Sequence, residues 1–127
     1  MSARDYAVIR SSYDALNARD VDAVLGHFTE DCIFDASRIM EGVYEGREAY
    51  RGFLERLLEA TEIVYTPEEM ITNPRGPVLV RTRLHGAGSS SKAPMVGELG
   101  FVYELEEALI HRQEVHPDPD ELLRSAA

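Results

Sequence analysis

The segment Ile110–His116 carries three ionisable side chains at a spacing of two residues: Arg112, Glu114 and His116, here called the charged trio. Side chains on a β-strand alternate between its two faces, so a strand over this segment places all three on one face. Burying a charge costs several kcal/mol per ion unless the charge is paired or hydrated. A strand face with three such groups is therefore a candidate functional site.

The direction of this face depends on the hairpin that precedes the strand. A turn at Glu106–Glu107 that places Leu105 opposite Ala108 also places Phe101 opposite Arg112. Directly opposed residues of an antiparallel pair lie on the same face of the sheet. The sequence therefore predicts that the charged trio shares the apolar surface of Phe101, around which the sheet would fold a core or a cavity.

Glu114 and Arg112 are the pair best suited to chemistry. Their α-carbons would lie roughly 7 Å apart on one strand, which allows a bidentate ion pair between the side chains. In a dry pocket, Glu114 would act as a general base or acid, and Arg112 would orient it or stabilise an oxyanion. A structural ion pair at a hydrated pocket floor explains the same two residues equally well.

His116 and Tyr103 are further catalytic candidates. His116 would act as a proton shuttle at the pocket rim or would lie in water, because Pro117 ends the strand directly after it. The Tyr103 hydroxyl would donate to a substrate oxygen or would belong to a core tyrosine bonded to backbone or water. No metal site is expected, because His111 faces away from the charged trio and leaves too few ligands on one face.

Composition narrows the class of protein. The 127 residues are 44% hydrophobic and 28% charged, which suits one domain over residues 1–127. The net charge of -10 repels polyphosphate backbones and anionic lipids, so neither nucleic acid nor a membrane is an expected partner. The start of the chain has no apolar signal core, and the single cysteine, Cys32, has no partner for an internal disulfide. We therefore expect a soluble cytoplasmic protein.

Apolar residues recur at helical spacing in the N-terminal half. The pattern predicts a helix over Ala3–Arg19, a shorter helix over Val21–Phe28 with Asp20 as its N-cap, and a third helix from about Arg47 to Ala60. Between the second and third helices, the apolar run Cys32–Ala36 predicts a short strand followed by a loop.

After the third helix the apolar period changes to two, which predicts an antiparallel meander. Its last strands are expected at Val78–His85, Met95–Glu106 and Ala108–His116, and Asp118 is the expected N-cap of a final helical turn. The outer face of the meander mixes apolar and polar side chains, which suits contacts between subunits. The residues expected on it are Leu79, Arg81, Arg83, His85, Val102, His111, Gln113 and Val115.

Two stretches of the sequence resemble the SnoaL-like polyketide cyclases and ketosteroid isomerases of the nuclear transport factor 2-like superfamily. The first is Tyr13–Val24, YDALNARDVDAV, followed by the residues FTEDC, and the second is Tyr44–Ala49, YEGREA. The order of the expected elements is similar too. The resemblance implies a sheet curled around one side of a conical pocket, helices closing the other side, small apolar molecules bound between them, and homodimers formed sheet to sheet.

The sequence departs from the ketosteroid isomerases where their chemistry lies. The alignment places Ser12 where those isomerases have an oxyanion-hole tyrosine, Ala36 where they have the aspartate base, and Phe101 where they have a second acid. Asp35 adjoins Ala36 on the opposite strand face; it is a second pocket carboxylate or an exposed edge residue, depending on a register of one residue, and the exposed position is favoured. Steroid isomerisation is therefore not the expected reaction.

These observations together predict an α+β fold, a cone-shaped, curled antiparallel sheet wrapped by three N-terminal helices. The hypothesis is a cofactor-free enzyme that moves a proton on a small apolar substrate, by isomerisation, cyclisation, dehydration or epoxide opening. The alternative is a non-catalytic ligand-binding or dimeric assembly module with the same fold. The expected ligand-binding residues are Phe34, Phe53, Leu57, Leu99, Phe101 and Ile110, and the catalytic candidates are Glu114, Arg112, His116 and Tyr103.

Overall fold

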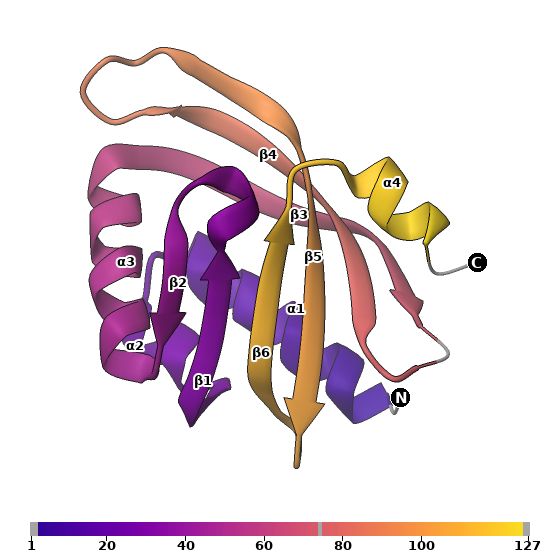
Figure 1. Cartoon of the computed structure of the whole chain (residues 1–127). Helices are drawn as coiled ribbons and strands as arrows, with labels where there is room; N and C mark the ends of the chain where they lie inside the picture. The colour runs from indigo at the N-terminus through magenta and orange to yellow at the C-terminus, as the bar shows by residue number, and fades with distance from the viewer. Residues whose placement is uncertain (1–2, 74, 126–127) are drawn as a thin grey trace.

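The computed structural model describes residues 3–73 and 75–125. One twisted, curled sheet is covered by helices α1, α2 and α3 on its concave side and by the short helix α4 on the outside (Figure 1), which confirms the predicted α+β class. The helices are α1 (Ala3–Asn17), α2 (Val21–Leu25), α3 (Arg47–Ala60) and α4 (Pro119–Arg124), with a 3-10 turn, η1 (Ser37–Ile39). The strands are β1 (Phe28–Ala36), β2 (Gly42–Glu45), β3 (Thr61–Thr72), β4 (Val78–Gly88), β5 (Pro94–Glu106) and β6 (Leu109–His116).

The helices follow from local sequence. Ile9 and Tyr13, four residues apart on α1, are both buried, as the apolar stripe predicts. At the start of α2 the Asp20 carboxylate accepts a hydrogen bond of 3.1 Å from the backbone nitrogen of Ala23, and Asp118 caps α4 in the same way. In the described part of the chain, no helix has the length and apolar character needed to cross a membrane.

The strands are ordered β2-β1-β6-β5-β4-β3 in a single sheet. Neighbours are antiparallel except β1 and β6, which run parallel and connect the first part of the sheet to its last strand. β3, β4 and β5 form the expected meander. These three strands are long, and they bend over the helical side so that the inner face of the sheet is concave (Figure 1).

The hairpin between β5 and β6 turns one residue later than predicted. Its loop residues, Glu107 and Ala108, have positive φ angles of 51° and 63°, the left-handed conformation that suits a two-residue hairpin loop. Glu106 pairs with Leu109 across it. A loop displaced by one position on both strands moves the pairing by two residues, so this difference alone keeps each side chain on its predicted face.

A bulge in β6 reverses the faces. Glu104 pairs with Arg112, whereas the residue after Glu104 pairs with Ile110, so His111 is an extra residue in β6. A slip of one residue turns every later side chain of the strand to the opposite side of the sheet. Phe101 consequently lies opposite Val115. The prediction that the charged trio faces the apolar surface was wrong, because the trio lies on the outer face.

Three smaller differences concern the elements around β1. β1 begins at Phe28 and is longer than the predicted run, so α2 ends earlier, at Leu25. The first part of β1 includes the polar residues 29–31, which are partly or fully exposed to solvent. An apolar run therefore did not predict it. The predicted loop after β1 contains η1 and the short strand β2, which pairs with β1.

The outer face also differs from the prediction. Gln113 and Val115, expected on it, point inward and are 5% and 2% exposed. α4 packs over β4 and β5. It approaches closely where β5 has Gly100, because a Cβ there would lie 2.6 Å from the Cδ2 atom of Leu122. The face available to a second subunit is therefore narrower than the sequence suggested.

Candidate functional site

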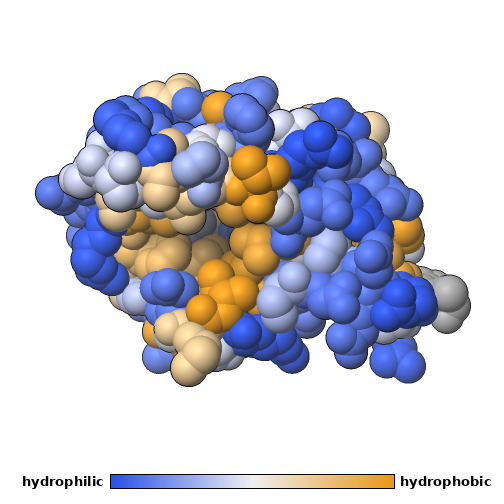
Figure 2. Space-filling view, turned by 90° about the horizontal axis from the view of Figure 1, so that it is seen from above, coloured by the Kyte–Doolittle hydropathy of each residue, from blue (hydrophilic) through white to orange (hydrophobic). Residues whose placement is uncertain are grey.

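An open cavity of about 430 Å³ lies between α1, α3 and the inner face of the sheet. It appears as a hollow in the end of the molecule toward which the β4–β5 hairpin bends (Figure 2). Among its lining residues, Glu41, Arg56 and Met95 are exposed and so mark its opening to solvent. The size suits a small organic molecule.

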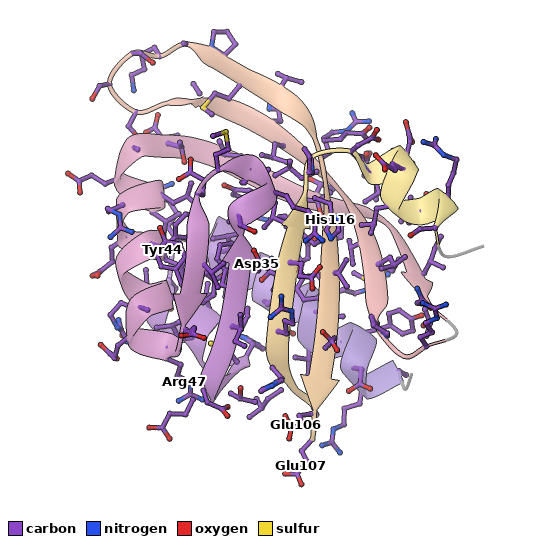
Figure 3. The ribbon with its side chains drawn as sticks, in the orientation of Figure 1. Asp35, Tyr44, Arg47, Glu106, Glu107 and His116 are labelled. Atoms are coloured by element: carbon purple, nitrogen blue, oxygen red, sulfur yellow. The ribbon has the colours of Figure 1, made fainter. Side chains whose placement is uncertain are left out.

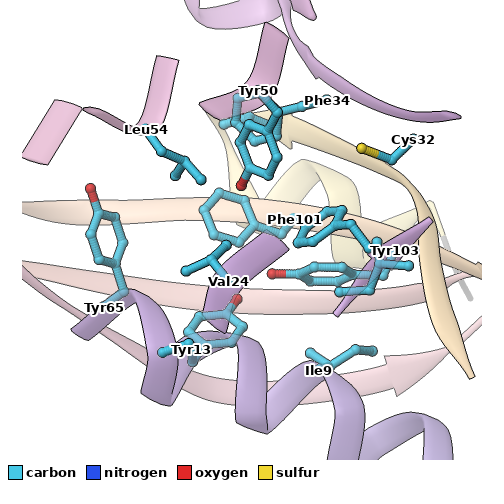
Figure 4. Packing of buried hydrophobic residues seen from close by; sticks show 14 of the residues in the cluster. Ile9, Tyr13, Val24, Cys32, Phe34, Tyr50, Leu54, Tyr65, Phe101 and Tyr103 are labelled. Carbon is cyan, nitrogen blue, oxygen red and sulfur yellow. The ribbon is translucent and has the colours of Figure 1, made fainter. Parts of the chain in front are cut away.

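Nine of the ten aromatic residues of the chain line this cavity. On one wall, the Phe34 ring stacks on Tyr50 with centroids 4.5 Å apart at 18°, and it contacts Phe53 at 5.0 Å. On the opposite wall, Phe101 and Tyr103 meet edge to face at 6.1 Å (Figure 4). Walls of this kind favour a flat, apolar or aromatic body.

Hydroxyl groups are the main polar feature of the interior. The Tyr13 hydroxyl lies 2.6 Å from Oγ1 of Thr82, and the Tyr103 hydroxyl points toward it (Figure 4) and is hydrogen-bonded to it. Tyr13 is 3% exposed, Thr82 0% and Tyr103 2%. Helix α1 contributes the first of these residues and strands β4 and β5 the other two, so the cluster joins the helical layer to the sheet.

Burial keeps these phenols protonated. Desolvation raises the pKa of both Tyr13 and Tyr103 above the usual value. Hydrogen bonds from Thr82 and Tyr103 oppose this rise at Tyr13, whereas the hydrogen bond to Tyr13 raises the pKa of Tyr103 further. Either hydroxyl of the Tyr13–Thr82 pair can be the donor, and an arrangement in which Thr82 and Tyr103 both donate to the Tyr13 oxygen would stabilise a tyrosinate. In that arrangement the Tyr13 proton is available to a ligand.

Gln113 adds a neutral amide to the cavity wall. Sequence reasoning missed it, because without the bulge its side chain would point outward. A signal was present: residues 112, 114 and 116 are all ionisable, and residues 113 and 115 are not. Burying one amide costs less than burying three ionisable groups, so the alternation itself favours an inward Gln113.

The charged trio forms an ion network with Asp35 on the outer face, where Figure 3 labels Asp35 and His116. Nε of Arg112 donates to Glu114 Oε2 at 2.9 Å, and Nη2 donates to Asp35 Oδ2 at 3.0 Å. Nε2 of His116 lies 3.1 Å from Glu114 Oε1. None of the trio lines the cavity, so in this position the pair of Glu114 and Arg112 corresponds to the structural alternative stated above.

Both carboxylates of the network are held ionised. The pKa of Asp35 is lowered, first by the hydrogen bonds from Ser37 and then by Arg112. Burial would raise the pKa of Glu114, but the hydrogen bonds from Arg112 and His116 outweigh it and leave that pKa below its usual value. Asp35 lies on the outer face, which was the favoured of the two positions, although its side chain is only 13% exposed.

The other predicted site residues are mostly at the cavity. Those that line it are Phe34, Phe53, Leu57, Leu99, Phe101 and Tyr103. Ile110 is the exception: it is fully buried in the core and does not line the cavity, because the bulge follows it directly. Contact of any of these side chains with a ligand stays a prediction.

Comparison with protein families gives one match. A family model described as the SnoaL-like domain matches residues 9–113. No significant match was found among curated protein sequences.

Solved structures share the fold over nearly the whole chain. An NTF2-like protein from Burkholderia pseudomallei superposes with a TM-score of 0.80 at 20% identity, over 98% of this chain and 97% of that one. SalBIII, described as an epoxide hydrolase/cyclase-like enzyme in pyran ring formation in polyether salinomycin, gives 0.78 at 22% identity, over 88% of both chains. A candidate polyketide cyclase from Xanthomonas campestris gives 0.73 at 20% identity, over 98% and 97%. At such identities the likeness establishes the fold.

Proposed function

Because the chain belongs to the SnoaL-like domain family, within the NTF2-like superfamily, we propose that it is an enzyme that binds a small, mainly apolar molecule and catalyses a cofactor-free proton-transfer reaction on it. The reaction class is ring formation or isomerisation through a carbonyl or epoxide oxygen. The observation that carries the proposal is the Tyr13 hydroxyl, which is hydrogen-bonded to two other hydroxyl groups in the buried part of an aromatic cavity.

The tyrosine cluster suits the role of a neutral acid. A phenol that accepts hydrogen bonds from Thr82 and Tyr103 is a stronger donor, since its developing negative charge is stabilised. In a cavity with aromatic walls, such a donor polarises a carbonyl or epoxide oxygen more strongly than it would in water. Tyr13 would donate to the substrate oxygen, and Tyr103 and Thr82 would support it.

The residues that line the cavity favour reactions that need a proton donor over reactions that need a carboxylate base. Among the described residues that line the cavity, Glu41 is the only carboxylate, and it is exposed at the opening. An intramolecular epoxide opening meets this restriction. The hydroxyl oxygen of the substrate forms the new C–O bond, the epoxide C–O bond breaks, and the freed oxygen takes a proton from Tyr13. The attacking hydroxyl releases its own proton, which returns to the hydroxyl cluster, so the product is an isomer of the substrate.

A second candidate is ligand binding without turnover. The same exposed position of Glu41 favours it, because the interior then holds donors for a ligand but no charged base. The two candidates share the cavity and the tyrosine donor. They differ only in whether a bound molecule is converted.

A binding comparison tests the donor. We would measure the affinity of 2-naphthol and of naphthalene by fluorescence, for the wild type, Tyr13→Phe and the control Tyr6→Phe, which removes a phenol that bonds Thr72 outside the cavity. The wild type should prefer the naphthol by about tenfold, the value of one good hydrogen bond. Tyr13→Phe should lose this preference and keep its affinity for naphthalene, while Tyr6→Phe should behave as the wild type. Full preference in Tyr13→Phe would contradict the donor role.

A turnover experiment separates the two candidates. A phenyl-bearing epoxy-alcohol is incubated with each variant, and the cyclic ether, an isomer of equal mass, is separated by chromatography. Ring closure above the buffer rate, reduced by about 100-fold in Tyr13→Phe, is the expected result for general acid catalysis. Tight binding with no ring closure across a set of chain lengths would support the binding module instead.

A further inference from the structure

The opening of the cavity carries a single cation. Among the described residues that line the cavity, Arg56 is the only Lys or Arg, and Glu41 is the only acid. Both residues are exposed. A ligand whose body lies among the aromatic rings would therefore meet one guanidinium and one carboxylate as it leaves the cavity.

The Arg56 side chain has defined contacts at this position. Its Nη2 atom donates to the Tyr44 hydroxyl at 3.3 Å, and its guanidinium carbon lies 5.9 Å from the centre of the Tyr44 ring. Figure 3 labels Tyr44 on β2, the strand beside α3. These contacts hold the guanidinium near the ring without neutralising it.

Gly52 lies close to the Arg56 guanidinium. It lies one turn before Arg56 in α3, and a Cβ there would be 3.3 Å from Nη1 of Arg56. Glycine inside a helix is unfavourable by about 1 kcal/mol relative to alanine. Among residues other than proline, glycine has the lowest helix propensity. It stands at position 52, where a Cβ would make a tight contact with the Arg56 guanidinium.

The charge of Arg56 is not taken up by a neighbouring acid. No carboxylate of residues 3–73 or 75–125 forms an ion pair with it, whereas Arg51 on the same helix pairs with Asp22 at 2.9 Å. The chain has 23 acidic residues against 13 Lys and Arg. Arg56 lies at the opening of an apolar cavity and has no acidic partner among the described residues. Its N–H donors are therefore available to a ligand.

We propose that Arg56 binds the carboxylate of an amphiphilic ligand, an aromatic or other apolar carboxylic acid whose body lies in the cavity. The inference rests on the proposed binding function and adds the acid group to the ligand. A guanidinium presents parallel N–H donors that match the two oxygens of a carboxylate. The Glu41 carboxylate repels the ligand carboxylate, so it lowers the affinity. It also favours ligands whose carboxylate lies close to Arg56 and away from Glu41.

The test compares two ligands with one ring system, 2-naphthoate and 2-naphthol, by calorimetry or fluorescence at neutral pH. Arg56→Gln should weaken the naphthoate by about tenfold, as expected for one charge-assisted hydrogen bond, and should change the naphthol less than twofold. The naphthoate affinity of Arg56→Lys should lie between those of the wild type and Arg56→Gln, because lysine keeps the charge without the paired donors. Glu41→Gln should strengthen the naphthoate, since it removes a repelling charge.

Gly52→Ala tests the positioning separately from the charge. The added methyl group should displace the guanidinium and weaken the naphthoate by about threefold, with the naphthol unchanged. The helix itself should be more stable, because alanine replaces glycine. A midpoint of urea unfolding at or above that of the wild type shows that the loss of affinity is local.

The outcomes separate this inference from the function on which it rests. If the naphthol binds but Arg56→Gln leaves the naphthoate unchanged, or weakens both ligands equally, the carboxylate site is wrong and the cavity function stands. If neither ligand binds the wild type, both proposals are wrong. Selective loss of the naphthoate in Arg56→Gln, with the opposite change in Glu41→Gln, establishes the carboxylate site.

Discussion

Replacing Arg112 by glutamine removes the cation that lies between two carboxylates of the outer face. Asp35 and Glu114 are register partners in the parallel pair of β1 and β6, and Arg112 donates to both, at 3.0 and 2.9 Å. In the variant, Asp35 keeps its hydrogen bonds from Ser37, while Glu114 keeps contacts with Arg38 and His116. Without the Arg112 charge between them, the repulsion between the Asp35 and Glu114 carboxylates is less fully offset.

The exposure of these groups sets the size of the effect. Removing one partner of a fully buried ion pair costs about 3–5 kcal/mol, whereas an exposed pair contributes about 0–1 kcal/mol. The side chains of Arg112, Asp35 and Glu114 are 29%, 13% and 21% exposed. The loss should lie between the two limits, at about 2 kcal/mol, which lowers the Tm of a domain of this size by roughly 6–12 °C.

The loss should depend on pH with a definite sign. The pKa values of Asp35 and Glu114 are lowered in the folded protein. Such groups stabilise the fold above their unfolded pKa values, about 3.9 and 4.3, and the contribution is lost as the pH falls through the folded values. The difference between wild type and Arg112→Gln should therefore be complete at neutral pH and should shrink below about pH 4.

Urea unfolding followed by circular dichroism measures this difference, with exposed Arg124→Gln as the control for loss of a cation. The affinity for 2-naphthol is measured in parallel and should remain that of the wild type, because Arg112 lies outside the cavity. An equal loss of stability at neutral and acid pH would refute the electrostatic reasoning. A loss of naphthol affinity in a fully folded variant would refute the placement of Arg112 on the outer face.

Three further predictions concern other parts of the fold. Tyr13→Phe leaves the buried hydroxyls of Thr82 and Tyr103 without this partner and should lower the free energy of unfolding by about 1–3 kcal/mol; adding Thr82→Val should recover the part that comes from Thr82, and an additive loss in the urea midpoints would contradict the pairing. Cys32 is fully buried, and burial raises the pKa of its thiol, so alkylation by iodoacetamide should require unfolding; rapid labelling of the native protein would argue against its position. A homodimer through the outer face should give twice the 14.2 kDa chain mass in light scattering, and a charge substitution at Val102 should shift it toward monomer; a monomeric wild type would exclude this assembly.

The elements that the sequence predicts well are those set by local patterns. The apolar stripe of α3 and the caps at Asp20 and Asp118 depend only on residues close together in the sequence. For this reason α3 begins and ends as predicted, and α2 and α4 begin as predicted. β2 was missed because a strand of four residues has too few positions to show a period. Its pairing with β1 is a tertiary contact.

The candidate site was predicted in part, for a different physical reason. The aromatic residues of the cavity were recognised because their helices and strands were recognised. The faces of β6 were reversed because one extra residue, His111, changes the register. The alternation of residues 112–116 favoured the observed faces, but the prediction was based on the hairpin register instead. The proposed role of Tyr13 was not predicted, because a tyrosine on a helical stripe indicates packing unless a cavity is known to lie beside its hydroxyl.

The parallel contact between β1 and β6 determines when the fold can be completed during synthesis. Residues 37–108 separate the two strands, and ribosomes add roughly 5–20 residues per second. Until β6 has emerged, the nascent β1 has only the short β2 as a strand partner, and Phe28 and Phe34 lack their register partners in β6. We therefore expect the sheet to be completed only late in synthesis, and a ribosome that stalls before residue 109 to leave the β6 side of β1 unpaired.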